Sequence, residues 1–106
     1  MGKKNIITLG ERIRSLRTEA GQSLKEVADA IGMDASLLGK IERDERAATR
    51  EQIRQFAAFF KVSEKLLLKE YLSDQIAYKL IDEDADPDTL RVAEAKMRYY
   101  KTSRKK

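Results

Sequence analysis

The chain contains neither cysteine nor histidine. Without thiols and imidazoles it forms no disulfide, offers no thiolate nucleophile or imidazole base, and lacks the ligands that zinc prefers. Proline occurs once, and aromatic residues make up only 7% of the chain. Because leucine, alanine, isoleucine, lysine, arginine and glutamate fill its middle, helix is the favoured backbone state almost throughout. We therefore predict an all-α protein without a metal or a cofactor.

Long apolar stretches are also missing. No run approaches the roughly 18 consecutive apolar residues that indicate a membrane-spanning helix. The segment from Met1 to Ile7 lacks the long apolar core of a signal peptide. We therefore expect a cytoplasmic protein that does not bind a membrane. An enzyme is not expected, since acid–base work would fall to carboxylates or lysines in a cleft, and the chain has no glycine-rich phosphate loop.

The net charge of +4 is unevenly distributed. Residues 1–61 carry twelve Lys or Arg against nine Asp or Glu, residues 62–88 carry three against eight, and residues 89–106 carry seven against one. Both ends are basic and the segment between them is acidic. Basic segments suit a polyanion, although a solvated surface of mixed sign explains the same charges equally well.

Apolar residues recur at intervals of three and four, and polar caps stand between the groups. Ser23 with Glu26 forms a capping box, Asp34, Thr49 and Ser63 are further N-caps, and Gly21 and Gly32 end helices. The predicted helices cover residues 9–20, 24–31, 34–43, 49–60, 63 to about 82, and 87 to about 101. The pattern leaves open whether the fifth is one helix or two shorter ones that meet near Ser73.

The acidic run from Asp82 to Asp86 resembles the start of a calcium loop. Pro87 stands where the sharp turn of such a loop requires glycine, and Ala93 stands where a bidentate glutamate belongs. We therefore predict no metal site there, but an acidic linker that ends in an N-cap at Asp86 followed by proline.

The segment from Ser23 to Arg43 is the most informative. It predicts a helix of about eight residues, a tight turn over Gly32, Met33 and Asp34, and a second short helix. The small Ala28 and Gly32 allow the two helices to cross closely and steeply. A helix held in this way projects its N-terminal end outward, which is the geometry that a DNA major groove accepts.

On these residues the chain resembles the phage-repressor and Cro-like (XRE-type, lambda-repressor-like) helix-turn-helix family. The resemblance runs from Leu9 to Leu67 and includes Leu16-Arg17, Gly21, the whole of Ser23 to Arg43, Ile53 to Phe60, and Val62-Ser63. It implies a five-helix DNA-binding domain at residues 9–68, with an N-terminal arm before it at residues 1–8. It also implies a transcriptional regulator whose recognition helix is 34–43.

The resemblance implies roles for individual residues as well. The base-reading positions are Ala35, Ser36, Leu37 and Lys40, and the phosphate-contacting positions are Ser23, Lys25, Arg43 and Arg46. Arg17 and Glu42 match a structural ion pair that ties the first helix to the third. Leu24 and Ala35 replace the long polar residues that many relatives have there, so the shape of the DNA is expected to contribute to recognition.

Some assignments have two readings. The alternative for Lys40 is a phosphate contact or a solvated lysine. Arg12 and Arg14 are expected to be solvated rather than to contact DNA. The alternative for the whole helix-turn-helix is an element that binds only protein. Phe56, Phe59 and Phe60 are expected in the core rather than as base-stacking platforms.

Residues 69–101 form a helical extension beyond the resemblance, and residues 102–106 form a basic tail. Amphipathic helices need a partner for their apolar faces, and two half-sites one DNA turn apart need a two-fold dimer. We predict a homodimer whose interface contains Tyr71, Ile76, Leu80, Leu90, Met97 and Tyr100. The expected function is a repressor that binds a palindromic operator in double-stranded DNA. The alternative is an antitoxin-like or adaptor protein whose extension binds another protein.

Overall fold

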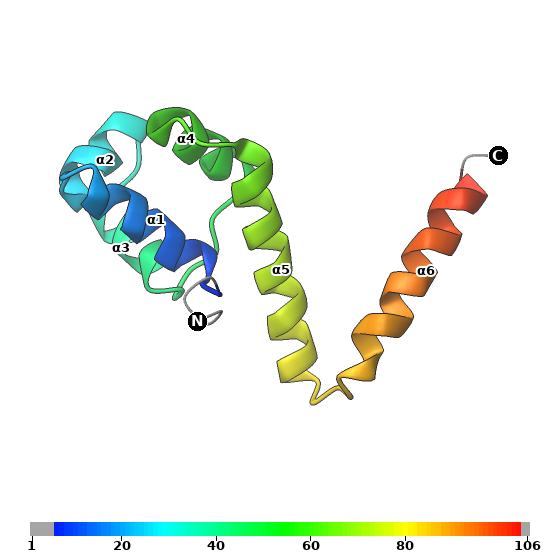
Figure 1. Cartoon of the computed structure of the whole chain (residues 1–106). Coiled ribbons are helices and arrows are strands. Elements are labelled where there is room, and N and C mark those ends of the chain that lie inside the picture. The colour runs from blue at the N-terminus through cyan, green and yellow to red at the C-terminus, as the bar shows by residue number, and fades with distance from the viewer. Residues whose placement is uncertain (1–5, 105–106) are drawn as a thin grey trace. The chain divides into compact units, whose positions relative to one another are not determined.

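The computed structural model describes residues 6–104, which form six α-helices and no strand. The helices are α1 (Leu9–Glu19), α2 (Leu24–Ile31), α3 (Ala35–Glu42), α4 (Arg50–Phe60), α5 (Glu64–Asp82) and α6 (Asp88–Arg104) (Figure 1). The all-α prediction is confirmed. Residues 1–5 of the predicted N-terminal arm and residues 105–106 of the predicted basic tail lie outside the described residues.

Most helices begin where the sequence places a cap. Ser23 and Glu26 form the expected capping box, and Thr8 with Glu11 and Thr49 with Gln52 form two more. Ser63 accepts a hydrogen bond from the backbone N–H of Leu66 (3.1 Å). Asp34 is the exception, because its side chain makes no capping hydrogen bond and only its backbone carbonyl accepts from Leu38.

The segment whose helix count the sequence leaves open is one uninterrupted helix, α5 (Figure 1). Ser73 does not break it, because its hydroxyl donates to the carbonyl oxygen of Glu70 within the same helix (3.1 Å). Helix α6 runs to Arg104, past the expected end near Lys101. Residues 102–106 contain no proline or glycine that would stop it earlier, and the hydroxyl of Thr102 donates to the carbonyl oxygen of Arg98 (3.0 Å).

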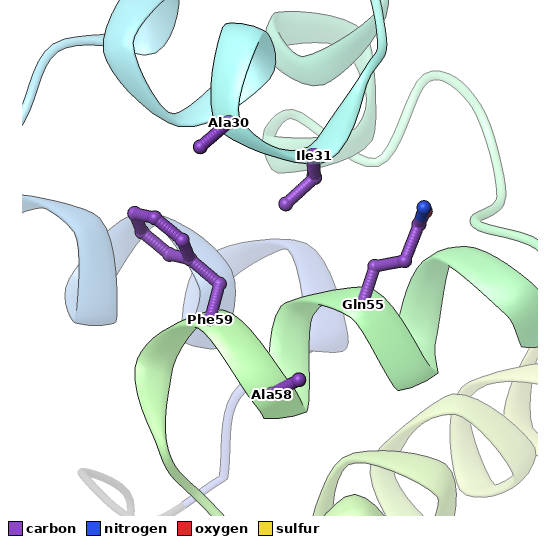
Figure 2. A pocket seen from close by; sticks show the side chains of 5 residues that line it. All are labelled: Ala30, Ile31, Gln55, Ala58 and Phe59. Atoms are coloured by element: carbon purple, nitrogen blue, oxygen red, sulfur yellow. The ribbon is translucent and has the colours of Figure 1, made fainter.

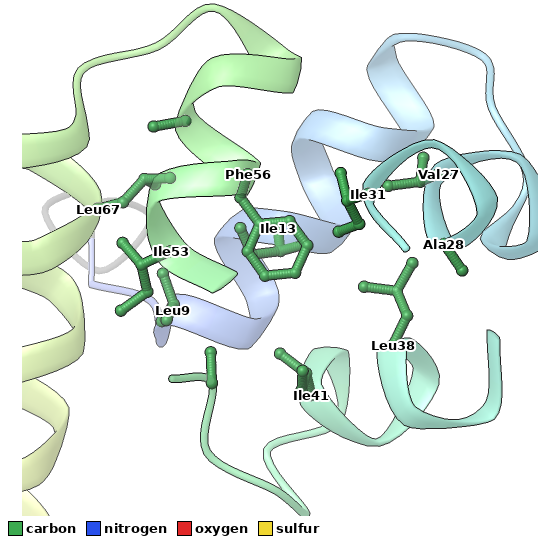
Figure 3. Close-up of a cluster of buried hydrophobic side chains, with 12 residues drawn as sticks. Leu9, Ile13, Val27, Ala28, Ile31, Leu38, Ile41, Ile53, Phe56 and Leu67 are labelled. Carbon is green, nitrogen blue, oxygen red and sulfur yellow. The ribbon is translucent and has the colours of Figure 1, made fainter. Parts of the chain in front are cut away.

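The hydrophobic core is built by α1 to α4 and the first turns of α5 (Figure 3). Its largest fully buried side chains are Phe56, Ile13, Leu38, Ile53, Leu67 and Val27. Phe59 and Phe60 are half-buried, pack against this core and meet edge to face with ring centroids 4.9 Å apart. The prediction that all three phenylalanines serve the core is confirmed.

The chain divides into two compact units, residues 1–74 and residues 75–106. The first contains α1 to α4 and more than half of α5. The second contains the last turns of α5 and the whole of α6, which buries none of its described residues. The described residues of the second unit therefore form no core of their own.

Two polar contacts tie α1 to α5 within the first unit. The guanidinium of Arg12 donates to both carboxylate oxygens of Glu70, at 2.7 to 3.2 Å. One turn further along α5, a carboxylate oxygen of Asp74 accepts from the backbone N–H of Leu9 (2.8 Å). Burial raises the pKa of Asp74 above its usual value, against the lowering effect of the bond from Leu9, and the negative charges of Asp44, Glu70 and Glu11 add to the rise.

The start of α1 also lies directly against the end of α3. The hydroxyl of Thr8 donates to the carboxylate of Asp44 (2.8 Å). A Cβ at position 10 would collide with the backbone carbonyl oxygens of Ile41 and Glu42, so glycine is required by the closeness of the two helices. The first turn of α1 is thus packed between α3 and α5.

Candidate nucleic-acid interface

The turn between α2 and α3 is made by a glycine in the left-handed conformation. Gly32 has a φ of 75°, which a residue without a Cβ adopts at no steric cost. The next residue, Met33, donates its backbone N–H to the carbonyl oxygen of Ala28 (2.9 Å) and closes the end of α2. Ala28 and Leu38 are fully buried, so the two helices pack through small and apolar side chains.

Helix α3 has a buried side and an outward stripe. Leu38, Gly39, Ile41 and Glu42 are buried. Ser36, Lys40 and Arg43 are exposed and follow one another at intervals of four and three, which places them on one face. Ala35 and Leu37 are half-buried and pack against the core. Of the four base-reading positions, Ser36 and Lys40 therefore present the most side-chain surface.

An ion pair fixes the last turn of α3 to α1. Two guanidinium nitrogens of Arg17 donate to the two carboxylate oxygens of Glu42, at 2.7 and 3.0 Å. A third donates to the carbonyl oxygen of Gln22 (2.9 Å). Only 13% of the Arg17 side chain and 5% of the Glu42 side chain are exposed. Hydrogen bonding to Glu42 raises the pKa of Arg17 despite burial, so the guanidinium stays charged.

The four expected phosphate contacts are all exposed, and two of them, Lys25 and Arg43, pair with a neighbouring carboxylate that competes for them. The Ser23 hydroxyl oxygen accepts from the Glu26 backbone, but its own proton remains free to be donated. Lys25 pairs with Asp29 at 3.0 Å, and Arg43 with Glu45 at 3.0 Å. Hydrogen bonding within the second pair raises the pKa of Arg43 and lowers the pKa of Glu45. Arg46 is exposed in the loop after α3.

Two basic residues lie differently from what the sequence suggests. Arg12 is partly buried and pairs with Glu70, 58 positions away, so it is not a freely solvated residue. Arg50, for which the sequence predicts no role, is exposed at the start of α4, four residues after Arg46. In the sequence, only its position shortly after the recognition helix marks Arg50 as a candidate for a phosphate contact.

The extension exposes most of its expected interface residues. The exposed fractions are 47% for Ile76, 51% for Leu90, 61% for Met97 and 55% for Tyr100. Leu80 is half-buried. Tyr71 is also half-buried, and it packs against the core of its own chain. Five of the six residues thus lie in the second unit, and four of these five are exposed. Tyr71 lies in the first unit.

A shallow hollow lies between α2 and α4 (Figure 2). Its walls are Ala30, Ile31, Gln55, Ala58 and Phe59, so it contains one polar side chain and no charge. Nothing in it suits acid–base chemistry. Across residues 6–104, no cluster of acidic side chains is arranged to hold a metal ion, and no helix is long and apolar enough to cross a membrane.

A family model described as a helix-turn-helix domain matches residues 8–68. Among solved structures, the chain is similar to the restriction-modification controller protein C.AhdI from Aeromonas hydrophila. The identity is 32%, the match covers 56% of this chain and 89% of that chain, and the TM-score is 0.53. It is also similar to SinR, a master regulator for biofilm formation, solved in complex with DNA. Here the identity is 34%, the match covers 57% of this chain and 98% of that chain, and the TM-score is 0.54.

A third solved structure matches more of the chain. The complex of SinR with SinI covers 90% of this chain and 99% of the matched chain, at 24% identity and a TM-score of 0.53. This likeness concerns the fold alone. A comparison with curated proteins finds no match.

Proposed function

Since the chain belongs to the lambda-repressor-like family of helix-turn-helix transcriptional regulators, we propose that it is a sequence-specific repressor that binds a palindromic operator as a homodimer. It acts through DNA binding rather than catalysis, in the cytoplasm. The observation that carries the proposal is the outward stripe of Ser36, Lys40 and Arg43 on α3. The buried Arg17–Glu42 pair holds that stripe in place.

The chemistry of the stripe suits a major groove. Lys40 donates to guanine O6 or N7, and the Ser36 hydroxyl donates to or accepts from several base edges. Ala35 and Leu37, at the rim of the stripe, offer apolar contact to a thymine methyl group. Arg46, Lys25 and Ser23 supply donors for phosphate oxygens, which position the helix without reading the sequence. SinR, which shares 34% identity, was solved with DNA bound.

The extension supports the homodimer. On α6, Leu90, Met97 and Tyr100 recur at helical spacing on one face, while Val92 and Tyr99 lie on another, and all five are exposed. Such a helix needs more than one neighbour to bury its apolar surface. A second copy offers two further helices of the same kind.

Charge also favours a second copy as the partner. Residues 75–88 carry five Asp or Glu against one lysine, and residues 89–104 carry five Lys or Arg against one glutamate. Each extension thus has an acidic half and a basic half. Two copies that run antiparallel bring unlike halves together, which favours self-association over repulsion.

Salt dependence tests the proposed DNA contacts. If Lys25, Lys40, Arg43 and Arg46 of both copies meet phosphates or bases, the logarithm of the binding constant falls with log salt at a slope of about −4 to −8, at roughly 0.9 per neutralised phosphate. The Arg46→Ala variant lowers the slope, and Lys69→Ala, at an exposed position on α5, leaves it unchanged. A slope near zero would contradict the proposal. It would favour the adaptor alternative, in which the extension binds another protein.

A further inference from the structure

Arg43, the residue that follows α3, turns its side chain back along the helix. A Cβ at position 39 would lie 3.1 Å from Nη1 of Arg43 and 4.0 Å from its Cζ. The guanidinium therefore lies directly over Gly39, one helical turn closer to the N-terminus of α3 than the Cα of Arg43. Side chains on a helix lean in this direction. Because position 39 has no side chain, the guanidinium can approach the helix backbone.

Glu45 holds one edge of this guanidinium. One carboxylate oxygen of Glu45 accepts from Nε of Arg43 at 3.0 Å, and the other accepts from Nη2 at 3.4 Å. Two bonds to one carboxylate fix the direction of a guanidinium as well as its distance. One N–H of Nη1 and one of Nη2 remain side by side at the end of the group. The Arg43 side chain is 57% exposed, so a ligand can reach this end.

The backbone after α3 places Glu45 beside Arg43. Asp44 has a φ of 62°, in the left-handed region, which turns the chain back. The backbone N–H of Glu45 then donates to the carbonyl oxygen of Lys40 (2.8 Å), a bond typical of the Schellman turn that ends many helices. The side chain of Asp44 accepts from the hydroxyl of Thr8 (2.8 Å), which ties the turn to α1. The place of Glu45 is thus set by the fold and not only by its exposed ion pair.

The guanidinium lies beside the expected base-reading positions. Ser36 and Lys40 are exposed on the same face of α3 as Arg43. An arginine that extended outward from the end of α3 would reach the rim of a groove, where the phosphates lie. Folded back over Gly39, it lies at the middle of α3, closer to the N-terminal part that contacts base edges in helix-turn-helix proteins. Two parallel N–H donors of arginine match O6 and N7 of guanine.

We propose that Arg43 reads a guanine in each half-site, and that Glu45 is the positioning residue that directs it there. The inference rests on the proposed function, because it needs α3 in a major groove. It assigns Arg43 to a base, whereas the family resemblance implies a phosphate contact. Glu45 adds a negative charge near the DNA, so it lowers the affinity for every sequence. In return it restricts the guanidinium to the orientation that matches guanine.

The test is a competition assay with the selected operator and with variants that change one base pair in both half-sites. At one G·C pair, the wild type prefers the operator over its variants about 10- to 100-fold. Arg43→Lys keeps the charge but cannot make two parallel bonds. In this variant the preference at that pair falls below about threefold, while the preferences at the other pairs and the salt slope remain.

Glu45→Ala tests the positioning role. An exposed ion pair contributes little, so the preference at the same G·C pair falls about two- to fivefold. The affinity for unrelated DNA rises at the same time, because a negative charge near the phosphates is lost. Glu51→Ala is the matched control: it opens an equally exposed pair with Arg54 on α4 and leaves every base-pair preference unchanged. Urea midpoints at the wild-type value show that these surface variants are folded.

Three results would overturn the inference, in whole or in part. If the wild type prefers particular base pairs and Arg43→Ala weakens binding to every sequence alike, Arg43 contacts a phosphate, and the proposed function stands without the inference. If Glu45→Ala raises the affinity for all sequences equally, Glu45 only competes with DNA and its positioning role is overturned. If the wild type prefers no base pair, the proposed function fails and the inference fails with it.

Discussion

Single residues hold α1 against α3 and α5 through contacts between positions that are far apart in the sequence. Arg17 and Glu42 are 25 positions apart, Arg12 and Glu70 are 58 apart, and Leu9 and Asp74 are 65 apart. The first pair comes from the family resemblance. The other two have no signal in the sequence, because charged residues at these separations are common and most of them are solvated.

The Arg17–Glu42 pair predicts a large loss of stability when one partner is neutralised. In Glu42→Gln, the buried Arg17 guanidinium keeps the Gln22 carbonyl and one amide oxygen as acceptors, but it loses its counter-charge and faces an NH2 group in place of the second carboxylate oxygen. Breaking a buried pair costs about 3 kcal/mol or more in the free energy of unfolding, measured by urea denaturation. Glu45→Gln removes an exposed partner of Arg43 and is the control, with no measurable change. Equal midpoints for the two variants would show that the buried pair stabilises nothing.

Gly10 predicts a steric effect. A methyl group in Gly10→Ala meets backbone oxygens of Ile41 and Glu42, which cannot move without shifting the end of α3. We expect thermal unfolding to show a loss of about 1–3 kcal/mol. Gly39→Ala is the matched control, because its methyl group meets only the flexible end of Arg43 and the side chain of Leu24. The prediction fails if both variants unfold at the wild-type temperature.

Asp74 predicts a pH dependence. Its pKa in the folded chain lies above its usual value, because burial disfavours the charged carboxylate. Protonated Asp74 therefore makes its full contribution to the free energy of unfolding below the usual pKa of about 3.9. This contribution is lost as the pH rises through the pKa of the folded chain. Asp74→Asn keeps an acceptor for Leu9 and cannot ionise. Its stability relative to the wild type increases with pH in denaturant titrations. A difference that shrinks with pH would show that the helix N-terminus lowers the pKa instead.

At the scale of elements, the sequence predicts the helices well because their limits are set locally. Ser23, Thr49 and Ser63 cap the helices that follow them, and Gly32 ends α2, all through contacts within a few residues. The length of α5 was not predictable, since Ser73 is equally compatible with a cap and with a hydroxyl bonded to its own helix. The packing of the first turn of α1 between α3 and α5 depends on tertiary contacts that no local pattern carries.

Helix α3 predicts different consequences for Lys40 and Arg46. If Lys40 reads a base, Lys40→Ala loses about 1–3 kcal/mol of discrimination at one base pair. Arg46→Ala, at a phosphate, weakens binding to all sequences alike. Competition assays with single-base variants of the operator separate the two outcomes. A uniform loss in Lys40→Ala would assign Lys40 to the DNA backbone and leave Ser36 and Arg43 as the base readers.

At the scale of the whole molecule, the first unit has a core and the described residues of the second unit form none. The described residues of α6 are all exposed, including several large apolar side chains. A chain of this size buries only about two-thirds of its surface when it folds alone, so association of the extensions adds apolar burial that the monomer lacks. The sequence predicts that the extension is helical and amphipathic. It does not identify the partner, because the same apolar faces suit a second copy and another protein.

If the extension forms the homodimer, a single charged substitution on its apolar face dissociates the two copies. Met97→Asp places a carboxylate on the face shared by Leu90 and Tyr100, where burial of an unpaired charge is costly. Light scattering should then report a monomer at concentrations where the wild type is a dimer. Operator affinity falls on the order of a hundredfold, and half-site affinity is retained. Lys96→Ala, at the adjacent exposed position, stays dimeric. A wild type that is already monomeric would contradict the homodimer.

Selection of bound fragments from sheared host DNA by the purified chain, followed by sequencing, tests the central claim most directly. The claim predicts sharp enrichment of a two-fold symmetric motif near a few promoters, with half-sites about one helical turn apart. Uniform enrichment without a motif, lost at moderate salt, would contradict it. The chain would then bind DNA only through its charge, and the extension would be the place to search for a protein partner.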